Sequence, residues 1–290
     1  MQKINHIRPE DNEFTEVLAN IALMPEILHY YGNLPEKRLK TVAIVGSRHN
    51  TRYGEEVAYK LAYELAKKGV VIVSGLAYGI DSIAHKGAVD AGGVTIGVLG
   101  TEIEKIYPRS HVGLAQRMVD LGGVVMSELQ RGDQYYPAVS FLQRNRIISG
   151  LSDVVVVVEA AEKSGSLNTA THALEQGKEL FAVPGNITNP YSQGCNKLIK
   201  QGAEPYTGVE DVMNLLFPPK RKTKQSGQLV IFGDNEMETA ILKEMYEGEE
   251  DGDAIIAKLK INTAEFNQTI TMLEIKGRVR AQGANKWILL

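Results

Sequence analysis

The chain has 290 residues, a formal net charge of −3 and a single cysteine, Cys195, so it can form one large and one small domain but no internal disulfide. Its 43% hydrophobic and 23% charged residues are typical of a globular protein, and the charge balance excludes a strongly basic nucleic-acid-binding surface over the whole chain. The N-terminus has no apolar signal segment and no apolar run could cross a bilayer, so we expect a cytoplasmic protein with no membrane partner.

Strand-like and helix-like segments alternate through most of the chain. Residues 1–40 form a short mixed lead-in, where IALMPEILHYYGN (21–33) is expected to form a helix. Buried-strand patterns follow at 41–46, 70–75, 94–100, 122–128, 153–160 and 179–185, and helical patterns at 53–68, 80–91, 114–121, 141–150, 167–176, 194–200 and 209–216. The most hydrophobic strand, 153–160, is placed at the centre. This order predicts an α/β fold with a doubly wound, mostly parallel sheet over residues 41–217.

The remaining residues predict a linker and a small second domain. Residues 218–233 follow two prolines and are expected to be a basic linker, with the cations Lys220, Arg221, Lys222 and Lys224. Residues 234–290 read as three helices (237–246, 253–259, 263–275) and a hairpin, which is the winged-helix pattern. This tail holds more acidic than basic residues, which favours a protein-contact or dimerisation module. Contact with DNA stays open through a basic strip, Lys276, Arg278, Arg280 and Lys286.

Three polar loops follow predicted strands and precede helices. They are Gly46-Ser47-Arg48, the segment 74–81 with Gly75 and Gly79, and the segment 164–169 with Ser164, Gly165 and Ser166. A helix N-terminus presents unpaired N–H groups and a partial positive charge, and ligands of such sheets bind beyond the carboxyl ends of the strands. Three such ends on one sheet predict a phosphate-binding face. Tight turns and helix capping alone are the alternative.

The individual side chains refine this prediction. Ser47 offers a hydroxyl and Arg48 a planar fork for phosphate. Asp81, expected at a helix N-cap, would repel phosphate and is expected to hold its loop instead. His85 lies four residues after Asp81, but no third ligand is near in sequence, so we expect a structural histidine and no metal site.

Aromatic and cationic side chains lie near the predicted loops. They include Tyr107 and Arg109, and also Phe141, Arg144 and Arg146; the last two are two residues apart on a helix, so only one is expected to face a site. Aromatic residues beside cations suit single-stranded nucleic acid, although a lone aromatic is more often a core residue. The dinucleotide and P-loop fingerprints and a nucleophile motif are all missing, and none of the acids Glu128, Glu159 and Glu175 stands out as a base.

The ordered motifs resemble those of the DNA-processing protein A family, also called DprA or Smf. They include VAIVGSR, VVIVSGLAYGID, FLQRNRIISGLS, VVVVEAAEKSGSLNTA and ELFAVPGNI, and run from about residue 42 to residue 216. The resemblance implies an extended Rossmann-like fold, homodimerisation and single-stranded DNA binding. It also implies protection of incoming single-stranded DNA and its delivery to the RecA recombinase during natural transformation, without catalysis and without a cofactor.

The resemblance also assigns site residues. Arg48 matches the arginine of the G-S-R motif, Arg109 the basic residue after Y-P, and Phe141, Arg144 and Arg146 the motif F-P-x-R-N-R; the S-G-S loop falls on residues 164–166. Tyr78 replaces the usual cation of S-G-L-A-[RK]-G-I-D, which removes a phosphate contact or offers a stacking surface. Leu142 replaces the motif's proline. The short lead-in is expected to lack the extra N-terminal helical domain of some relatives.

Two other classes of function remain open. The first is a nucleotide sensor or an enzyme similar to nucleotide phosphoribohydrolases. Such enzymes carry a glutamate in a P-G-G-x-G-T-x-x-E loop, and here His172 stands where that glutamate would be. The second is a purely protein-binding adaptor, which leaves the clustered anion loops without a purpose.

Overall fold

The computed structural model describes residues 3–134, 136–218, 233–283 and 285–289. The chain divides into two compact units, Met1–Pro218 and Pro219–Leu290. The cations Lys220, Arg221, Lys222 and Lys224 of the predicted basic linker lie outside the described residues.

The first unit is built on a sheet whose described part has nine strands in the order β1-β2-β6-β5-β4-β3-β7-β8-β9. From β6 to β9 every neighbouring pair is parallel, whereas β2 pairs antiparallel with both β6 and β1. The strands are β1 (Asn5–Ile7), β2 (Leu28–Gly32), β3 (Thr41–Val45), β4 (Val71–Ser74), β5 (Thr95–Leu99), β6 (Val124–Ser127), β7 (Val154–Val157), β8 (Glu179–Ala182) and β9 (Glu204–Pro205).

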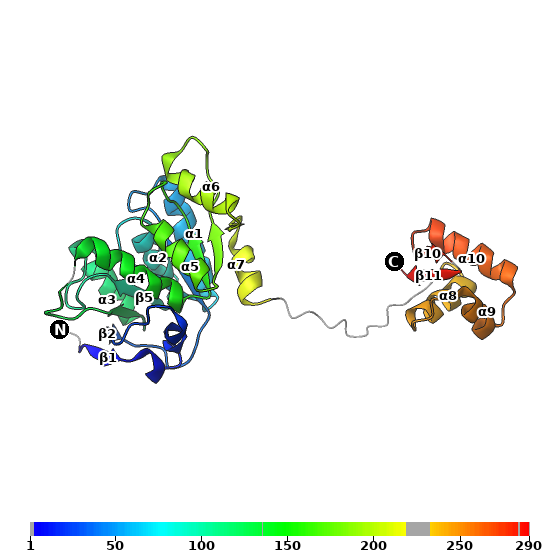
Figure 1. Cartoon of the computed structure of the whole chain (residues 1–290), viewed down its shortest axis with the longest axis horizontal. Helices are drawn as coiled ribbons and strands as arrows, with labels where there is room; N and C mark the ends of the chain where they lie inside the picture. The colour runs from blue at the N-terminus through cyan, green and yellow to red at the C-terminus, as the bar shows by residue number, and fades with distance from the viewer. Residues whose placement is uncertain (1–2, 135, 219–232, 284, 290) are drawn as a thin grey trace. The chain divides into compact units, whose positions relative to one another are not determined.

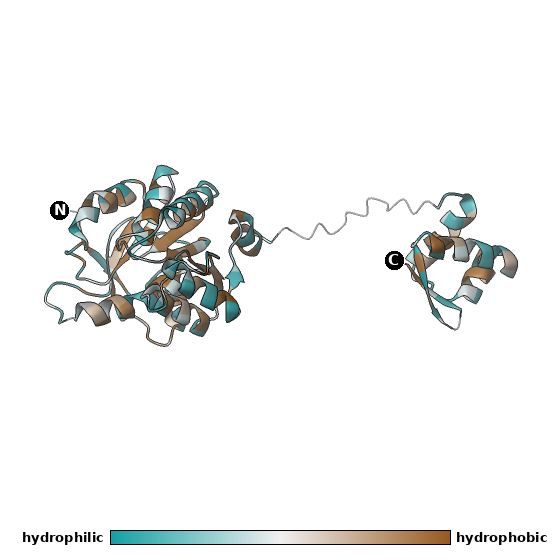
Figure 2. Cartoon of the chain, turned by 90° about the horizontal axis from the view of Figure 1, so that it is seen from above, coloured by the Kyte–Doolittle hydropathy of each residue, from teal (hydrophilic) through white to brown (hydrophobic). Residues whose placement is uncertain are grey.

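Helices cover both faces of this sheet (Figure 1). Alternate side chains of β3 point to opposite faces, so Val42 and Ile44 enter one core while Ala43 and Val45 enter the other. The first face carries α1 (Arg52–Lys67), α2 (Ile80–Asp90), α3 (Val112–Asp120) and α7 (Val209–Leu216). The second carries α4 (Pro137–Leu151), α5 (Ser166–Glu175) and α6 (Gln193–Lys200). Figure 2 shows the resulting apolar strands between helices whose outward sides are polar.

The six predicted parallel strands and seven helices are confirmed, but the expected helix over residues 21–33 is wrong. That segment contains β2, whose residues His29–Gly32 pair with β6. Pro25 interrupts any helical hydrogen bonding, and the aromatic residues near 30 suit a strand. The prediction that 153–160 is the central strand is also wrong, because β7 is the third strand in from the β9 side of the sheet.

The strand order reverses at β3, which lies between β4 and β7. Helices α1 and α2 follow β3 and β4 on one face, and α5 follows β7 on the other. The loops after β3, β4 and β7 therefore meet at one edge of the sheet, at a topological switch point.

The second unit contains α8 (Glu236–Tyr246), α9 (Gly252–Leu259), α10 (Thr263–Ile275) and the antiparallel pair β10 (Val279–Gly283) and β11 (Lys286–Leu289). Its core is formed by one side of each helix, with Leu242, Ile255 and Phe266 fully buried. The predicted three helices and hairpin are thus present in the predicted order.

Candidate functional site

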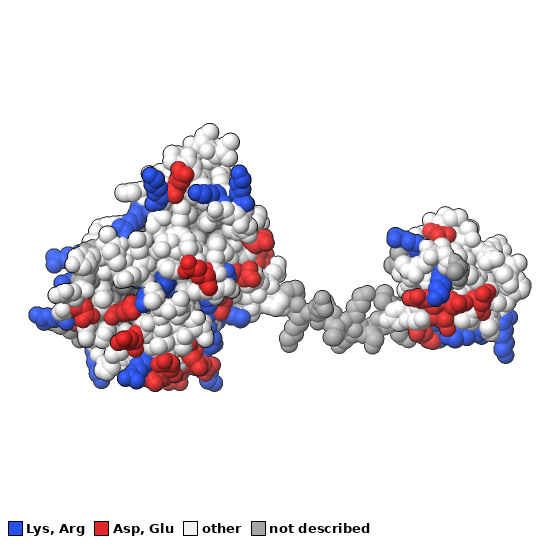
Figure 3. Space-filling view, in the orientation of Figure 1, with Lys and Arg blue, Asp and Glu red and all other residues white. Residues whose placement is uncertain are grey.

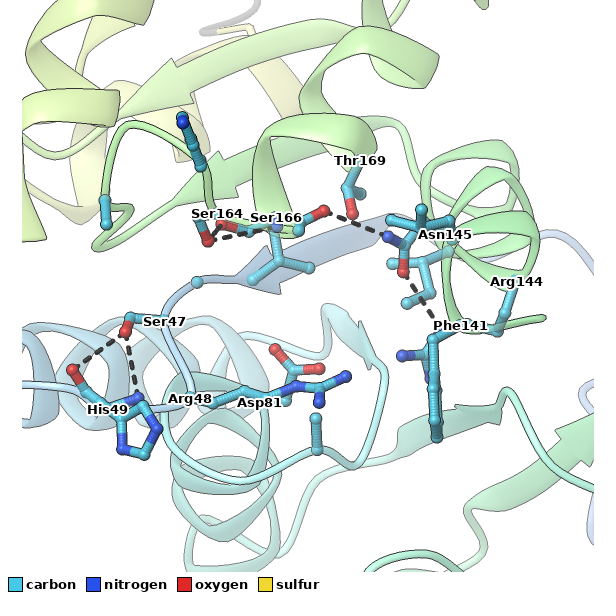
Figure 4. A pocket seen from close by; sticks show the side chains of 18 of the residues that line it. Ser47, Arg48, His49, Asp81, Phe141, Arg144, Asn145, Ser164, Ser166 and Thr169 are labelled. Carbon is cyan, nitrogen blue, oxygen red and sulfur yellow. Dashed lines mark hydrogen bonds between the residues drawn. The ribbon is translucent and has the colours of Figure 1, made fainter. Parts of the chain in front are cut away.

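The ends of β3 and β7 and the start of α4 enclose a pocket of about 420 Å³. The first and third predicted loops line it from opposite sides, and Phe141, Arg144 and Asn145 line it from α4 (Figure 4). The second loop contributes Ala77 and Asp81 rather than Gly75 and Gly79. The structure therefore brings most of the predicted site residues together at one place.

The first loop leaves its cation free but uses its hydroxyl. Ser47 is buried, and its Oγ donates to the carbonyl of His49 (2.9 Å) and accepts from the N–H of His49 (3.0 Å). The predicted offer of this hydroxyl to a ligand is not supported, because it stabilises the loop. Arg48 is exposed and its guanidinium carbon lies 5.2 Å from the ring centre of Phe141. Within the described residues this guanidinium has no ion-pair partner.

The N-terminus of α1 already holds a carboxylate. The helix begins at Arg52, four residues after Arg48, and its N-cap Thr51 is bound by the buried Glu159 at the end of β7. The carboxylate of Glu159 accepts from the N–H of Thr51 (2.8 Å) and from its hydroxyl (2.6 Å). A side chain at Gly54 would lie 2.3 Å from the same carboxylate, so glycine is required there. This helix end therefore already carries a negative charge, which disfavours a phosphate there.

The N-terminus of α2 is also occupied, by the first loop. The N–H of Ile80 donates to the carbonyl of Ser47 (3.1 Å), and a Cβ at Gly79 would lie 2.2 Å from that carbonyl. Gly79, with φ 76°, is the N-cap, so the expectation that Asp81 would cap the helix is wrong. Asp81 instead accepts from the N–H of Gly75 (3.1 Å) and holds the loop, as predicted. Burial raises the pKa of Asp81, while nearby Arg144 acts in the opposite direction.

The N-terminus of α5 differs from that of α1 because no carboxylate among the described residues binds it. Its N-cap Gly165 is exposed, and Ser164 and Ser166 share a hydrogen bond between their hydroxyls (2.8 Å). Among the described residues the N–H of Gly165 has no partner, and the N–H of Ser166 has only a 3.4 Å contact with Ser164 Oγ. Free N–H groups at a helix N-terminus attract an anion. Lys163, an exposed cation that the sequence analysis missed, lines the pocket beside them.

The two arginines of α4 have different roles. Arg144 is buried and donates to the carbonyls of Gly75 (2.7 Å) and Val98, which ties the ends of β4 and β5 to α4. Burial lowers its pKa to about 10, which leaves it charged at neutral pH as part of the pocket wall. A Cβ at Gly75 would lie 2.5 Å from this guanidinium, so glycine is needed for the approach.

Arg146 is turned away from the pocket. Its guanidinium donates to Glu128 (2.7 Å) and to the carbonyl of Leu23 (2.7 Å), and it is buried. Its prediction as a DNA contact is therefore not supported by its position, and of the two arginines only Arg144 lines the pocket. Arg146 ties α4 to the loop before β2.

Phe141 connects the pocket to a neighbouring hollow. Its ring centre lies 5.7 Å from that of Tyr107, which is about half exposed. Tyr107 and Arg109 line a separate hollow of about 480 Å³ rather than the pocket itself. The exposed Arg109 thus extends the cationic surface beyond the pocket, past an aromatic pair.

The other acids and histidines that the sequence singled out make structural contacts. Asp81 is the one carboxylate among the described residues that line the pocket. His172 lies 3.3 Å from Glu175 on α5. His85 is fully buried and its Nδ1 lies 2.7 Å from Thr95 Oγ1, in agreement with the predicted structural role.

On the face of the first unit seen in Figure 3, cations and acids alternate without one large field of either sign. No group of three potential metal-ligating side chains was found in the described part of the chain. None of its helices combines the length and the apolar character needed to cross a bilayer.

Comparisons with known proteins show which family this chain resembles. The family model of DNA recombination-mediator protein A matches residues 5–217. Protein Smf of Escherichia coli is 47% identical over 219 residues, which cover 74% of this chain and 58% of that protein. DNA processing protein DprA of Bacillus subtilis is 42% identical over 224 residues, covering 77% of this chain and 74% of that protein.

Two solved structures share the fold. DNA processing protein A of Streptococcus pneumoniae matches with a TM-score of 0.66 and 39% identity over 73% of this chain and 74% of that one. The Helicobacter pylori structure, which describes the single-stranded DNA binding mode of its DNA processing protein A, matches with a TM-score of 0.65 and 30% identity over 75% of this chain and 99% of that one. The chain belongs to the DNA recombination-mediator protein A family, also known as DprA or Smf.

Proposed function

We propose that this protein binds single-stranded DNA at the edge of the sheet where β3 and β7 end, without catalysing a reaction on it. The observation that carries this proposal is the open N-terminus of α5 beside Arg48 and Lys163, both exposed and without ion-pair partners in the described structure. A phosphate fits this arrangement because unpartnered N–H groups and two exposed cations line the same pocket. The single-stranded DNA bound by the Helicobacter pylori relative supports the choice of ligand.

The aromatic pair favours a single strand over a duplex. Phe141 and the half-exposed Tyr107 lie between the pocket and Arg109, so a strand that follows the cations passes aromatic rings. Unpaired bases stack on such rings whatever their sequence, whereas the bases of a duplex are already stacked. On the face seen in Figure 3, cations and acids are mixed, so no large cationic field on that face competes for the strand.

A catalytic role on nucleotides has weaker support. The pocket-lining carboxylate, Asp81, is buried and bound by the N–H of Gly75. A general base must reach a proton of the substrate, and this carboxyl is directed into its own loop. His172, at the position of the phosphoribohydrolase glutamate, pairs with Glu175. We therefore favour the non-catalytic function over the nucleotide-sensor or hydrolase alternative.

The proposal is tested by titrating a labelled single-stranded oligonucleotide with wild type and with Arg48→Ala. We expect binding to weaken about tenfold in 0.1 M salt and the slope of log K against log salt to fall by about 0.7, the value for one phosphate contact. Lys40→Ala is the matched control, because it removes an exposed cation just before β3, at the opposite edge of the sheet. Absence of wild-type binding at low salt, or equal losses in both variants, would contradict the proposal.

We extend the proposal to partners on the strength of the family membership. The bound strand is protected from nucleases and delivered to RecA in DNA recombination during natural transformation, and the protein acts as a homodimer in the cytoplasm. The second unit is proposed as a winged-helix module for protein contact. Nuclease protection, RecA filament formation on oligonucleotides with added protein, and molar mass by light scattering test these statements separately. A monomeric mass would contradict the proposed homodimer, and unchanged filament formation would contradict the proposed delivery to RecA.

A further inference from the structure

A second aromatic position lies on the loop between β4 and α2. Tyr78 is 48% exposed, and its ring packs edge-on against His111, with ring centres 5.2 Å apart and planes at 68°. Its hydroxyl forms no hydrogen bond within the described structure. The side chain is therefore held by one ring contact and leaves much of its surface to solvent.

The loop beneath this ring is rigidly held. His111 Nδ1 lies 2.9 Å from the carbonyl of Leu76, whose side chain is fully buried. Leu76 has φ 55°, a left-handed conformation that is unfavourable for a residue with a Cβ. It persists because Asp81 binds the N–H of Gly75 and Gly79 packs on Ser47. Strain that the surroundings hold in place is typical of functional loops.

Tyr78 stands between two hollows. Its neighbour Ala77 lines the phosphate pocket, and its other neighbour, Gly79, lies so close to Arg48 that an added Cβ would be 2.9 Å from Arg48 Cα. His111 also lines a second hollow of about 370 Å³ together with Lys86, Glu55 and Arg117, and Arg117 is paired with Asp90 (2.8 Å). Along this loop, Tyr78 is therefore the exposed aromatic ring next to the Arg48 site.

We propose that Tyr78, supported by His111, is a base-stacking position for the nucleotide adjacent to the phosphate held near Arg48. This proposal rests on the proposed single-stranded DNA binding and names a residue that sets the path of the strand. A preformed aromatic ring accepts any base and loses little conformational entropy on binding. Because Tyr78 carries no charge, its contribution to the affinity for the strand should not depend on salt. The contribution of a phosphate contact does depend on salt.

The test combines protein variants with abasic oligonucleotides. Wild type and Tyr78→Leu are titrated with a series of short strands, each carrying one abasic position. For wild type we expect the position that lies on Tyr78 to cost about tenfold in affinity, within the range for one stacked base, in addition to any positions that stack on Phe141 and Tyr107. In Tyr78→Leu the same abasic position should leave the affinity almost unchanged. The leucine variant has already lost the stacking contact, so removing the base removes nothing further. Tyr78→Phe retains the wild-type pattern, and Tyr63→Leu, which alters a tyrosine on α1, serves as the control.

The outcomes separate this inference from the proposed function. Tyr78→Leu binds about tenfold more weakly with an unchanged salt slope, whereas Arg48→Ala lowers the slope. If wild type binds the strand and Arg48→Ala weakens it, but every abasic cost is the same in Tyr78→Leu, the stacking position is wrong and the proposed function stands. If wild type binds no strand, both fail.

Discussion

The N-termini of α1 and α5 differ in how their positive ends are satisfied, although both follow strands that end at the same edge of one sheet. At α1 the carboxylate of Glu159 binds the N-cap Thr51, so the negative charge comes from the protein itself. At α5 the N–H groups of Gly165 and Ser166 face the pocket with only serine hydroxyls nearby. A strand-loop-helix sequence is therefore necessary for an anion site but is not sufficient. What decides is whether another part of the chain already supplies an acceptor, as Glu159 does at α1 and the carbonyl of Ser47 does at α2.

Removing the carboxylate at α1 has the largest expected effect. Glu159→Ala leaves the N–H and hydroxyl of Thr51 without their charged acceptor in a buried place, and we expect the free energy of unfolding to fall by about 3 kcal/mol. Urea denaturation followed by circular dichroism measures this change. Glu179→Ala, an exposed acid at the start of β8, is the control and should change stability by less than about 0.5 kcal/mol. Equal effects of the two substitutions would show that Glu159 does not stabilise this helix end.

A smaller effect, which depends on pH, is expected from His85 on α2. It concerns the free energy of unfolding. Burial, aided by the charges of His111 and Arg144, lowers the pKa of His85 to about 3, so the folded protein keeps this imidazole neutral while the unfolded chain binds a proton below about pH 6.5. The unfolded state then holds more protons, and stability falls as pH falls. Between pH 7 and pH 5 the loss due to His85 is about 2 kcal/mol. His85→Leu should lose less stability than wild type over this interval; a parallel pH profile would contradict the assignment.

Most of the fold could be predicted from periodicity. The parallel strands are continuous apolar runs and their helices have clear apolar stripes, so local patterns and their order agree. The strand β2 was missed because LHYYG has no strong alternation and its pairing with β6 joins residues almost 100 positions apart. Such a pairing leaves no signal in the local sequence. The second unit was predicted well because its helices are separated by clear polar breaks.

The site could be predicted in its location but not in its division of roles. Arg48, Phe141 and the third loop lie at the predicted edge, because parallel strands bring their carboxyl ends together. The burial of Arg144, the turn of Arg146 toward Glu128 and the occupation of α1 by Glu159 all depend on tertiary contacts. Lys163 could have been found, since it directly precedes the serine loop. Asn145 binds the carbonyl of Gly165 (3.3 Å), a contact that spacing alone does not reveal.

The most direct test is to make α5 resemble α1 by adding a carboxylate at its N-terminus. Gly165→Asp introduces that charge where an added Cβ meets nothing closer than Leu142 at 4.0 Å, and Gly165→Asn is the neutral control of equal size. We predict that the aspartate variant binds a labelled single-stranded oligonucleotide about tenfold more weakly than the asparagine variant, because a negative charge then lies beside the phosphate. Its melting temperature should be equal or higher, because acids stabilise helix N-termini. Equal affinities of the two variants would contradict the account, since DNA would then bind elsewhere than at the open end of α5.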